Sequence, residues 1–564
     1  DIHFSPAAAL VAADFADKVR VNPGNYADSR KFAVREYSDS EYEAELARVE
    51  ERFAPLVLKC KERGISIRIG TNHGSLSDRI MNRFGDTPEG MVESALEFVR
   101  ICEKHEYHDI ILSMKASNPK VMIAAYRLLA ARMAELGMDY PFHLGVTEAG
   151  NAEDGRIKSA IGIGSLLEDG IGDTIRVSLT EEPEAEIPVA QAIAARYERR
   201  PSQDCPLSGD VPWDPFHYER RPSTPVSIAD LSIGGTDTVA VLTPIDDLRD
   251  PATRARLLRW ASPAGRRQPK PDGAVLRLAG AEDVQLVQNW RQALQRLPQA
   301  RLPLIARSED VSLLQAALPS VDAILCGPQP ARELLQPLHD SGKPLVAEAS
   351  IGEMAEAPST IDDLLGVARD AFDLGVRTVL SLRAGDGDWI HAYRLLATRA
   401  ADAGIEAPIL LHASAGAEPL LPTSITIGSL LCDGLGDVVM ISGTADGTEL
   451  SFNILQGAGT RLTRTDYVAC PSCGRTLFDL QETTDRIKQR TSHLVGVKLA
   501  IMGCIVNGPG EMADADFGYV GGAPGMVNLY VGKECVEKGV PAEIADDRLI
   551  DLIRSRGKWQ EAGE

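Results

Sequence analysis

The sequence has no long apolar run and no excess of positive charge. None of its apolar runs approaches eighteen uninterrupted residues, so no segment is predicted to span a membrane. The opening DIHFSPAAALVAADFADK has neither the basic start nor the long apolar stretch of a secretory signal. The formal net charge of -22 argues against a surface that binds nucleic acid or an anionic membrane throughout. We therefore expect a cytoplasmic protein in which any anionic ligand is held by a local cluster of arginines and lysines.

The sequence also lacks a cysteine pattern typical of a disulfide framework. Its nine cysteines are an odd number, and they are scattered along a chain that shows no secretion signal. Six of them are expected to behave as small buried hydrophobic residues, because free cysteine is among the most buried residue types. Only three lie in turn-rich segments that would present a thiolate: Cys470, Cys473 and Cys504.

The first part of the chain, residues 1–195, repeats a short β-branched run followed by an amphipathic helical stretch. The six strand candidates end in DIHF, VRVNPGN, SIRIGTN, IILSMKAS, FHLGVTEAG and TIRVSLT. Strands that alternate with helices predict parallel βαβ units, and a closed barrel of this type takes eight strands. The fold class predicted is therefore α/β, with an incomplete TIM-type (β/α)8 barrel that lacks its first two strands.

A second barrel-like domain is predicted by an internal repeat. GSLLEDGIGD at residues 164–173 returns as GSLLCDGLGD at residues 428–437 with eight of ten positions identical, and AYRLLA at Ala125 returns at Ala392. The offsets of 264 and 267 residues nearly agree, which indicates a duplicated block. A proline-rich linker over 196–225 precedes this inserted domain, which we place at 226–455.

The remaining segment, 456–564, is predicted to be a small α+β domain that holds a metal centre. Cys470 and Cys473 form a Cys-x-x-Cys turn, Cys504 ends an apolar strand 31 residues later, and Glu511 follows a glycine-bracketed turn. Three thiolates suit zinc or an iron–sulfur cluster. A [4Fe–4S] cluster with three cysteines leaves one iron for a displaceable carboxylate. A zinc ribbon would need a fourth ligand, and the nearest histidine, His493, is expected on the surface in mid-helix. On spacing alone, a zinc ribbon with a missing ligand and a redox pair both stay open.

Polar side chains at the strand ends of the first barrel predict a diphosphate site. Functional groups of parallel barrels sit at the carboxyl ends of the strands, where Arg20, Arg68, Lys115 and Arg176 converge here. An unpaired charge is costly within an apolar strand, whereas a bound polyanion would satisfy all four cations. Glu148, on a neighbouring loop, is the candidate general acid or base.

The duplicated block provides an internal comparison for this site. Lys115 aligns with Arg383 and Ser178 with Ser442, whereas Glu148 aligns with Ala415 and Arg176 with Met440. A copy that keeps its glycines and core but loses these polar groups is expected to be structural, and the first barrel catalytic.

Six long motifs carry a resemblance to a known family: IRIGTNHGSL, SMKAS, HLGVTEAG, KSAIGIGSLLEDGIGDTIRVSLT, CPSCGR and GCIVNGPGE. They closely resemble the 4-hydroxy-3-methylbut-2-enyl diphosphate synthase family, in its large three-domain form. The resemblance implies reductive opening of 2-C-methyl-D-erythritol 2,4-cyclodiphosphate and loss of a hydroxyl, in isoprenoid synthesis by the non-mevalonate pathway. It also implies a [4Fe–4S] cluster and electrons from ferredoxin or flavodoxin.

The same resemblance assigns roles to individual residues. It implies that the cluster ligands are Cys470, Cys473, Cys504 and Glu511. It implies substrate contacts at Arg20, Arg68, Asn72, Lys115, Arg176 and Ser178, and an acid or base role for Glu148. Glu511, as an exchangeable ligand, would also take part in catalysis.

Two other classes of function compete with this enzyme. One is a zinc-binding structural protein on a degenerate barrel. The other is a dedicated electron carrier, which would not need the cluster of cations at the strand ends. The assembly is expected to be a monomer or a homodimer. One hypothesis is that the inserted barrel replaces a partner subunit's barrel, so that the small domain closes over the first barrel within one chain.

Overall fold

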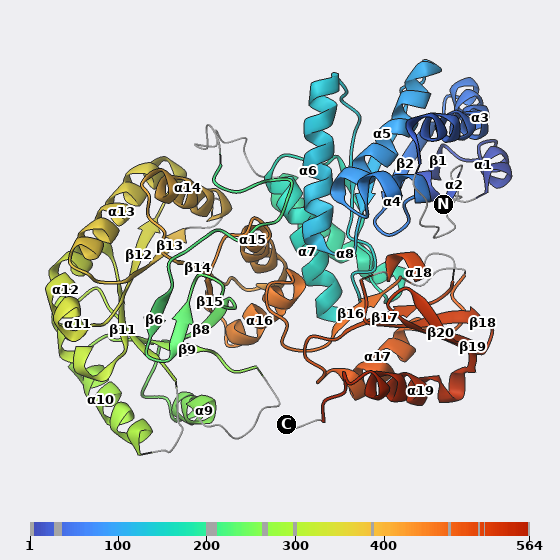
Figure 1. Ribbon diagram of the computed structural model, residues 1–564. Helices are drawn as coiled ribbons and strands as arrows, with labels where there is room; N and C mark the ends of the chain where they lie inside the picture. The colour runs from blue at the N-terminus through green and yellow to red at the C-terminus, as the bar shows by residue number, and fades with distance from the viewer. Residues whose placement is uncertain are drawn as a thin grey trace. The chain divides into compact units, whose positions relative to one another are not determined.

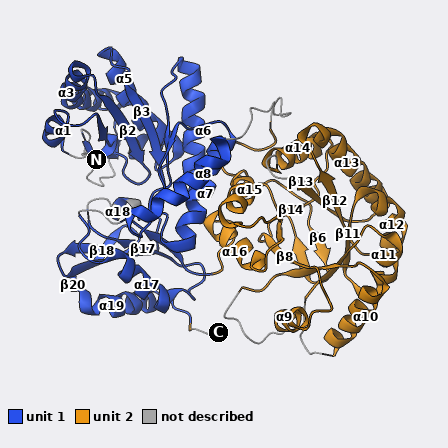
Figure 2. Cartoon of the chain, turned by 180° about the vertical axis from the view of Figure 1, so that it is seen from behind, with its two compact units in different colours: residues 1–199, 215–217, 464–560 blue, residues 200–214, 218–463, 561–564 orange. Residues whose placement is uncertain are grey.

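The computed structural model describes residues 5–26, 37–198, 211–261, 269–296, 302–384, 389–471, 475–505, 508–512 and 514–561 (Figure 1). The chain divides into two compact units (Figure 2). Unit 1 combines residues 1–199, 215–217 and 464–560, and unit 2 holds residues 200–214, 218–463 and 561–564. Two segments that are far apart in the sequence, 1–199 and 464–560, therefore belong to one unit. Among the described residues, no helix is long and apolar enough to cross a membrane.

The N-terminal part of unit 1 is built from parallel strands in chain order. Strands β1 (Lys18–Val21), β2 (Ser66–Asn72) and β3 (Ile110–Lys115) form one sheet, and β4 (His143–Leu144) pairs with β5 (Thr174–Ile175). A parallel bridge between Leu112 and Phe142 continues the order from β3 to β4. Five of the six predicted strands are confirmed, while DIHF lies outside the described residues.

Helices join these strands, as the βαβ pattern predicts. They are α1 (Pro6–Ala12), α2 (Pro23–Tyr26), α3 (Asp39–Arg63), α4 (Asp78–Phe84), α5 (Pro88–Lys104), α6 (Pro119–Leu136), α7 (Ala152–Glu168) and α8 (Glu186–Glu198). Local sequence sets their ends: Asn118 caps α6 before Pro119, and Gly137 ends it with φ 69°. Pro suits the first helical position because its missing N–H would have no partner there, and Gly suits the left-handed end.

Unit 2 is a closed barrel of eight parallel strands, as the repeat predicts for an inserted barrel-like domain. The strands are β8 (Ala240–Ile245), β9 (Gly273–Arg277), β10 (Leu304–Arg307), β11 (Ala323–Cys326), β12 (Leu345–Ile351), β13 (Thr378–Ala384), β14 (Ile409–Ser414) and β15 (Val438–Ser442). Its helices are α9 (Pro251–Ala261), α10 (Ala281–Gln295), α11 (Val311–Ala317), α12 (Pro328–Ser341), α13 (Ala357–Asp373), α14 (Trp389–Asp402), α15 (Leu420–Cys432) and α16 (Gly447–Gly457). The hairpin of β6 (Val226–Ile228) and β7 (Leu231–Ile233) packs against the apolar barrel interior.

Equivalent hydrogen bonds in the two barrels support the predicted duplication. The Tyr126 hydroxyl donates to the carbonyl of His143 at 2.5 Å, and the Tyr393 hydroxyl donates to the carbonyl of Leu410 at 2.7 Å. Each tyrosine is followed by an arginine that pairs with the first aspartate of the repeated motif, GSLLEDGIGD or GSLLCDGLGD. These pairs are Arg127–Asp169 at 2.7 Å and Arg394–Asp433 at 2.9 Å.

The C-terminal part of unit 1 is a five-stranded mixed sheet with two longer helices and the short helix α18 (Gly508–Glu511). The strands lie in the order β16 (Asp466–Ala469), β17 (Lys498–Met502), β18 (Phe517–Ala523), β19 (Met526–Val531) and β20 (Glu534–Pro541). The helices α17 (Leu480–Thr491) and α19 (Ala542–Ser555) carry buried apolar residues of one core cluster. The α+β class is as predicted, and β18 and β19 form an antiparallel hairpin.

One local prediction in this part is wrong. His493 lies beyond the end of α17, which stops at Thr491, and not in mid-helix. The Thr491 carbonyl at this helix end accepts a hydrogen bond from the Thr465 hydroxyl. The His493 ring instead packs edge-on against Trp559, with centroids 5.1 Å apart, and its Nε2 lies 2.8 Å from the carbonyl oxygen of Gln560.

Candidate active site

Three of the four predicted cations, Arg20, Lys115 and Arg176, lie at or beside the ends of neighbouring strands of unit 1, whereas Arg68 lies inside β2, four residues before its end. Arg20 and Arg68 are direct neighbours across the β1–β2 pair, and Asn72 lies beside Lys115 across the β2–β3 pair. Arg20 Nη2 donates to the Gly70 carbonyl and to Asn72 Oδ1, both at 3.0 Å. Arg176 directly follows β5. The structure therefore brings these residues to one edge of the sheet.

Burial and repulsion from neighbouring cations destabilise the positive charges of Lys115 and Arg68. Lys115 is 6% exposed, and its pKa is lowered well below the usual value, first by burial and then by Arg176, Arg68 and Arg20. Burial and Arg176 also lower the pKa of Arg68. A bound anion would relieve this repulsion, since an opposite charge at close range favours the charged form.

His143 lies beside these cations but carries no charge at neutral pH. Burial, followed by the field of Lys115 and Arg68, lowers its pKa to about 3. Its Nδ1 lies 2.8 Å from the Thr174 hydroxyl. His143 therefore serves the cluster as a neutral hydrogen-bonding group.

Two glycines that sequence reasoning missed, Gly70 in β2 and Gly145 directly after β4, make room for the cations. A Cβ at Gly70 would lie 2.5 Å from Arg20 Nε. A Cβ at Gly145 would lie 2.6 Å from the Arg176 carbonyl and 3.2 Å from Lys115 Nζ. The available signal was a glycine within each strand motif, IRIGTN and HLGVTE, because glycine weakens a strand and often marks a close approach.

Glu148 lies in a strained loop next to this cluster. It is 4% exposed and has φ 48°, in the left-handed region that non-glycine residues rarely adopt. Its charge raises the pKa of Lys115, which places the carboxylate within electrostatic reach of the cations. Ser178 is also buried, at 3% exposure. Strain of this kind is retained where the surrounding structure fixes the side chain.

Two of the predicted metal ligands meet at the ends of neighbouring strands in the C-terminal part. β16 and β17 are parallel, with Ala469 opposite Ile501, so Cys470 and Cys504 both follow their carboxyl ends. The Gly503 amide donates to Cys470 Sγ at 3.3 Å. Glu511 ends the short helix α18 (Gly508–Glu511), and Cys473 lies outside the described residues. Two half-exposed thiols on adjacent strands fit a shared centre with soft ligands.

The loop of Glu148 and the strand of Cys470 touch each other. Ala149 forms a parallel bridge with Ala469, and the Thr180 hydroxyl lies 3.5 Å from the Ala469 carbonyl. Glu148 precedes one residue of the bridged pair, and Cys470 follows the other. The candidate acid or base and the candidate cluster ligand are therefore one residue away from a common backbone contact.

Comparison with known proteins identifies the family. The GcpE TIM-barrel domain matches residues 1–191, and the GcpE protein C-terminal domain matches residues 466–555. A 4-hydroxy-3-methylbut-2-en-1-yl diphosphate synthase (flavodoxin) of Leptospira interrogans is 47% identical over 100% of this chain and 85% of its own. The chain belongs to the 4-hydroxy-3-methylbut-2-en-1-yl diphosphate synthase family.

Other members of this family also match along nearly the whole chain. The (flavodoxin) enzyme of Chlorobaculum tepidum is 44% identical over 99% of this chain and 79% of its own. The (ferredoxin), chloroplastic enzyme of Oryza sativa subsp. japonica is 45% identical over 99% of this chain and 76% of its own. The predicted resemblance is confirmed, and the zinc-binding alternative finds no support among these relatives.

The carboxyl end of the inserted barrel has a polar cluster that sequence reasoning missed. Glu348 Oε1 accepts from Arg307 at 2.9 Å, its Oε2 lies 2.5 Å from His412 Nδ1, and His412 Nε2 lies 3.0 Å from the Ser442 hydroxyl. Met440, the counterpart of Arg176, lies in the apolar interior. At the corresponding end, the inserted barrel therefore has a network in which Glu348 pairs with Arg307 and His412, in place of the neighbouring cations of the first barrel.

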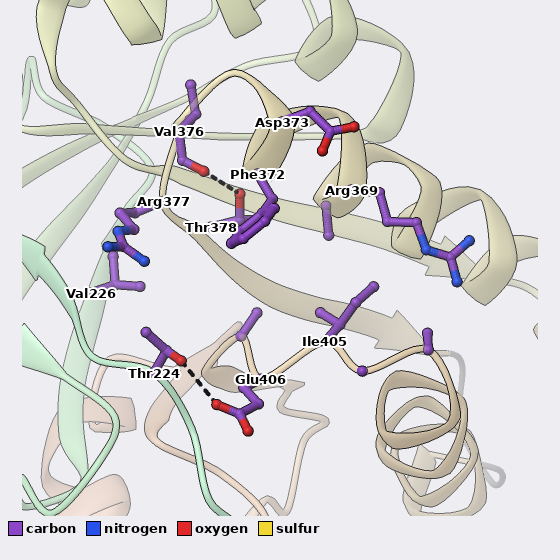
Figure 3. Close-up of a pocket in the computed structure, with 14 residues that line it drawn as sticks. Thr224, Val226, Arg369, Phe372, Asp373, Val376, Arg377, Thr378, Ile405 and Glu406 are labelled. Carbon is purple, nitrogen blue, oxygen red and sulfur yellow. Dashed lines mark hydrogen bonds between the residues drawn. The ribbon is translucent and has the colours of Figure 1, made fainter.

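The inserted barrel also has a cavity of about 480 Å³ at the other end of its strands (Figure 3). Phe372 and Ile405 line it, and the Thr224 hydroxyl donates to Glu406 at 3.2 Å beside it. Thr378, the first residue of β13, marks this as the amino end of the strands. Functional groups of such barrels gather at the opposite, carboxyl end.

Proposed function

We propose that this chain reductively opens 2-C-methyl-D-erythritol 2,4-cyclodiphosphate to 4-hydroxy-3-methylbut-2-enyl diphosphate in the non-mevalonate pathway. The observation that carries the proposal is the backbone bridge between Ala149 and Ala469. It links the loop at the cationic strand ends to the strand that leads into Cys470. The activity named for its relatives needs both a diphosphate site and a source of electrons.

The cationic cluster would bind and orient the two phosphates. Arg20, Arg68, Lys115 and Arg176 supply the charge, while Asn72 and Ser178 supply neutral hydrogen-bonding groups beside them. Charge-assisted hydrogen bonds to phosphate contribute roughly 1.5–3 kcal/mol each, which offsets the desolvation of the buried cations. A ligand that carries two phosphates uses the whole cluster, whereas a monophosphate leaves part of the repulsion in place.

Glu148 is proposed to hold and transfer a proton. Loss of a hydroxyl as water consumes two electrons and one proton, so a general acid is needed close to the leaving oxygen. The buried position of Glu148 and its location on the bridged loop suit this role. The neutral His143 is in the same region and helps to fix the hydrogen-bond pattern.

The electrons are proposed to come through a [4Fe–4S] cluster held by Cys470, Cys473, Cys504 and Glu511. When bound, such a cluster supplies electrons one at a time. Cys470 and Cys504 present thiols from adjacent strand ends, and Glu511 is the last residue of α18, which follows β17. Ferredoxin or flavodoxin is the proposed electron donor, since the related enzymes carry one or the other in their names.

Metal analysis of protein purified without oxygen tests this proposal. We expect iron and acid-labile sulfide with a brown colour in the wild type, and loss of all three in Cys504→Ser. Cys535→Ser is the matched control, because Cys535 lies on β20 near Tyr530 and should leave the cluster intact. Zinc without sulfide in the wild type would overturn the cluster assignment.

The inserted barrel, residues 226–455, is proposed to have a structural role, with 196–225 as its linker. The self-paired Glu348, His412 and Arg307 occupy the carboxyl end of its strands. No charge in this network needs a bound anion for compensation. The reaction is accordingly assigned to residues 1–195 and 456–564.

A further inference from the structure

The N-terminal end of α7 contacts the C-terminal part of unit 1 through several charged pairs. Asp154 pairs with Arg464 and also with Lys488, whose Nζ lies 3.2 Å from Asp154 Oδ2. One turn further along, Lys158 Nζ lies 2.8 Å from Asp466 Oδ1. Lys158 Nζ also approaches the Tyr467 carbonyl at 3.4 Å.

Asn151, just before α7, is a neutral side chain that adds hydrogen bonds to two charged side chains of α17. Its Nδ2 donates to Asp485 Oδ1 at 2.7 Å, and its Oδ1 accepts from Lys488. Asn151, Asp154 and Lys158 are spaced by three and four residues and therefore lie on one face of the helix. A single helical face thus contacts both β16 and α17.

The pairs differ in their exposure to solvent. The Lys158 side chain is 7% exposed and that of Asp466 is 17% exposed, whereas Asp154, Lys488 and Arg464 are partly exposed, at 23%, 21% and 30%. Burial alone would raise the pKa of Asp154, but the charges of Lys488, Arg464 and Lys158 lower it below the usual value. Breaking a buried pair leaves an uncompensated charge, which costs far more than losing an exposed pair.

The location of these contacts connects them to the chemistry. α7 begins four residues after Glu148, and β16 ends one residue before Cys470. The charged pairs therefore lie next to the Ala149–Ala469 bridge along both chain segments. An apolar contact would let the two surfaces slide past each other. Here α7 supplies the acid in the Asp154–Lys488 pair and the base in the Lys158–Asp466 pair. A shift of the helix would bring like charges together, so the pairs specify one register.

We propose that Asp154 and Lys158, with their partners Lys488, Arg464 and Asp466, form an ionic latch. This latch positions the strand of Cys470 over the loop of Glu148 within one chain. These are positioning residues that act through the Ala149–Ala469 contact. The expected effect of the latch on kcat rests on the proposed function. The latch itself can be tested by hydrogen exchange, which needs no enzymatic activity.

The first test uses the full-length, metal-free protein and hydrogen exchange. Lys158→Met should speed amide exchange at least tenfold in β16 and in the loop around Ala149, while exchange in the inserted barrel stays unchanged. The charge swap Lys158→Asp with Asp466→Lys should restore slow exchange. Lys61→Met is the matched control, because Lys61 pairs with Glu106 on the surface, where the side chains are 42% and 88% exposed. Unchanged exchange in Lys158→Met, or no recovery in the swap, would overturn the latch.

The second test uses the cluster-loaded enzyme. Lys158→Met and Asp154→Asn should lower kcat at least tenfold with little change in KM, because the cationic cluster remains intact. The charge swap should recover most of kcat. If activity is absent in the wild type while the exchange results hold, the proposed function fails and the latch stands. If KM rises and kcat is unchanged, the positioning role is wrong.

Mixing two inactive variants decides whether closure is within one chain. Glu148→Gln and Cys504→Ser each remove one half of the site, so a mixture should stay inactive when each chain closes on itself. Recovery of activity in the mixture would show closure between chains and overturn the latch as proposed.

Discussion

Arg20 lies directly opposite Arg68 in the parallel β1–β2 pair, so two arginines occupy paired positions on adjacent strands. Arg20 is held by the carbonyl of Gly70 and the amide oxygen of Asn72, which are both uncharged. With Lys115 nearby, the cluster raises the free energy of the ligand-free protein. Binding of an anion releases that energy, which links affinity to the instability of the empty site.

Removal of one cation should therefore stabilise the protein while it weakens anion binding. We expect Lys115→Met to raise the unfolding free energy by roughly 1 kcal/mol, because a buried and repelled charge is lost. Affinity for inorganic pyrophosphate should fall about 10- to 100-fold, as one charge-assisted hydrogen bond disappears. Urea denaturation and calorimetry measure the two effects.

The duplicated barrel supplies the control for that variant. Arg383, the counterpart of Lys115, is exposed, so Arg383→Met should change stability by less than about 0.5 kcal/mol and leave pyrophosphate binding unchanged. Wild-type affinity in Lys115→Met would contradict the assignment of the anion site.

Pyrophosphate binding should be accompanied by proton uptake. The folded pKa of Lys115 is lowered, so between that value and its ordinary pKa of about 10.4 the unfolded chain binds more protons and stability rises with pH. A bound anion raises the pKa again, and the lysine then takes up a proton. Calorimetry in two buffers with different ionisation enthalpies should show this uptake in the wild type and not in Lys115→Met. Equal heats in both buffers for the wild type would argue against a partly neutral Lys115.

A methyl group at Gly70 should disrupt the anion site from within the strand. In Gly70→Ala the new Cβ would lie 2.5 Å from Arg20 Nε and 3.1 Å from the Ser113 hydroxyl, so Arg20 must move. Pyrophosphate affinity should fall at least tenfold in a titration. Gly416→Ala is the matched control, since a Cβ there meets no atom within 4 Å and binding should be unaffected. Normal binding by Gly70→Ala would show that the position of Arg20 is not critical.

The polar network of the inserted barrel should matter for stability and not for turnover. Glu348→Gln removes a buried charge that pairs with Arg307 and His412, so we expect a loss on the order of 3 kcal/mol at pH 7. Urea denaturation measures this loss, and kcat at low temperature should stay within twofold of the wild type. A large loss of kcat in a folded Glu348→Gln protein would contradict the structural role.

The same variant should show a pH dependence with a defined sign. Burial alone would raise the pKa of Glu348, but His412 and Arg307 lower it below the ordinary value of about 4.3. Its stabilising effect is therefore present above that value and is lost as pH falls through the folded pKa. The difference between the wild type and Glu348→Gln should shrink below about pH 4.

Local patterns in the sequence predicted the strands and the cations, but not the contacts between distant segments. Arg20, Arg68 and Lys115 could be assigned to one edge because parallel strands in chain order bring their carboxyl ends together. The network of Glu348, His412 and Ser442 could not be predicted from the sequence, because it depends on which side chains face inward on separate strands. The end of α17 before His493 was also missed, because the polar pattern of the helix continues through this point in the sequence.

The latch was beyond sequence reasoning for a related reason. Asp154 and Lys488 are separated by more than 300 residues, with an entire barrel between them. Nothing in the local pattern of α7 distinguishes these charges from an ordinary solvated helix face. Their pairing becomes visible only when both ends of the chain are placed in one compact unit.

The thiols of Cys470 and Cys504 extend from strands that are already fixed by an apolar core, which includes Tyr467, Ile501 and Leu529. The residues of that core are apolar and include no candidate cluster ligand among the fully buried ones. We therefore expect the C-terminal part to fold before a cluster is bound. Cluster insertion would then take place into a domain that is already folded. Cells starved of iron should therefore accumulate a folded, colourless protein and not an unfolded one.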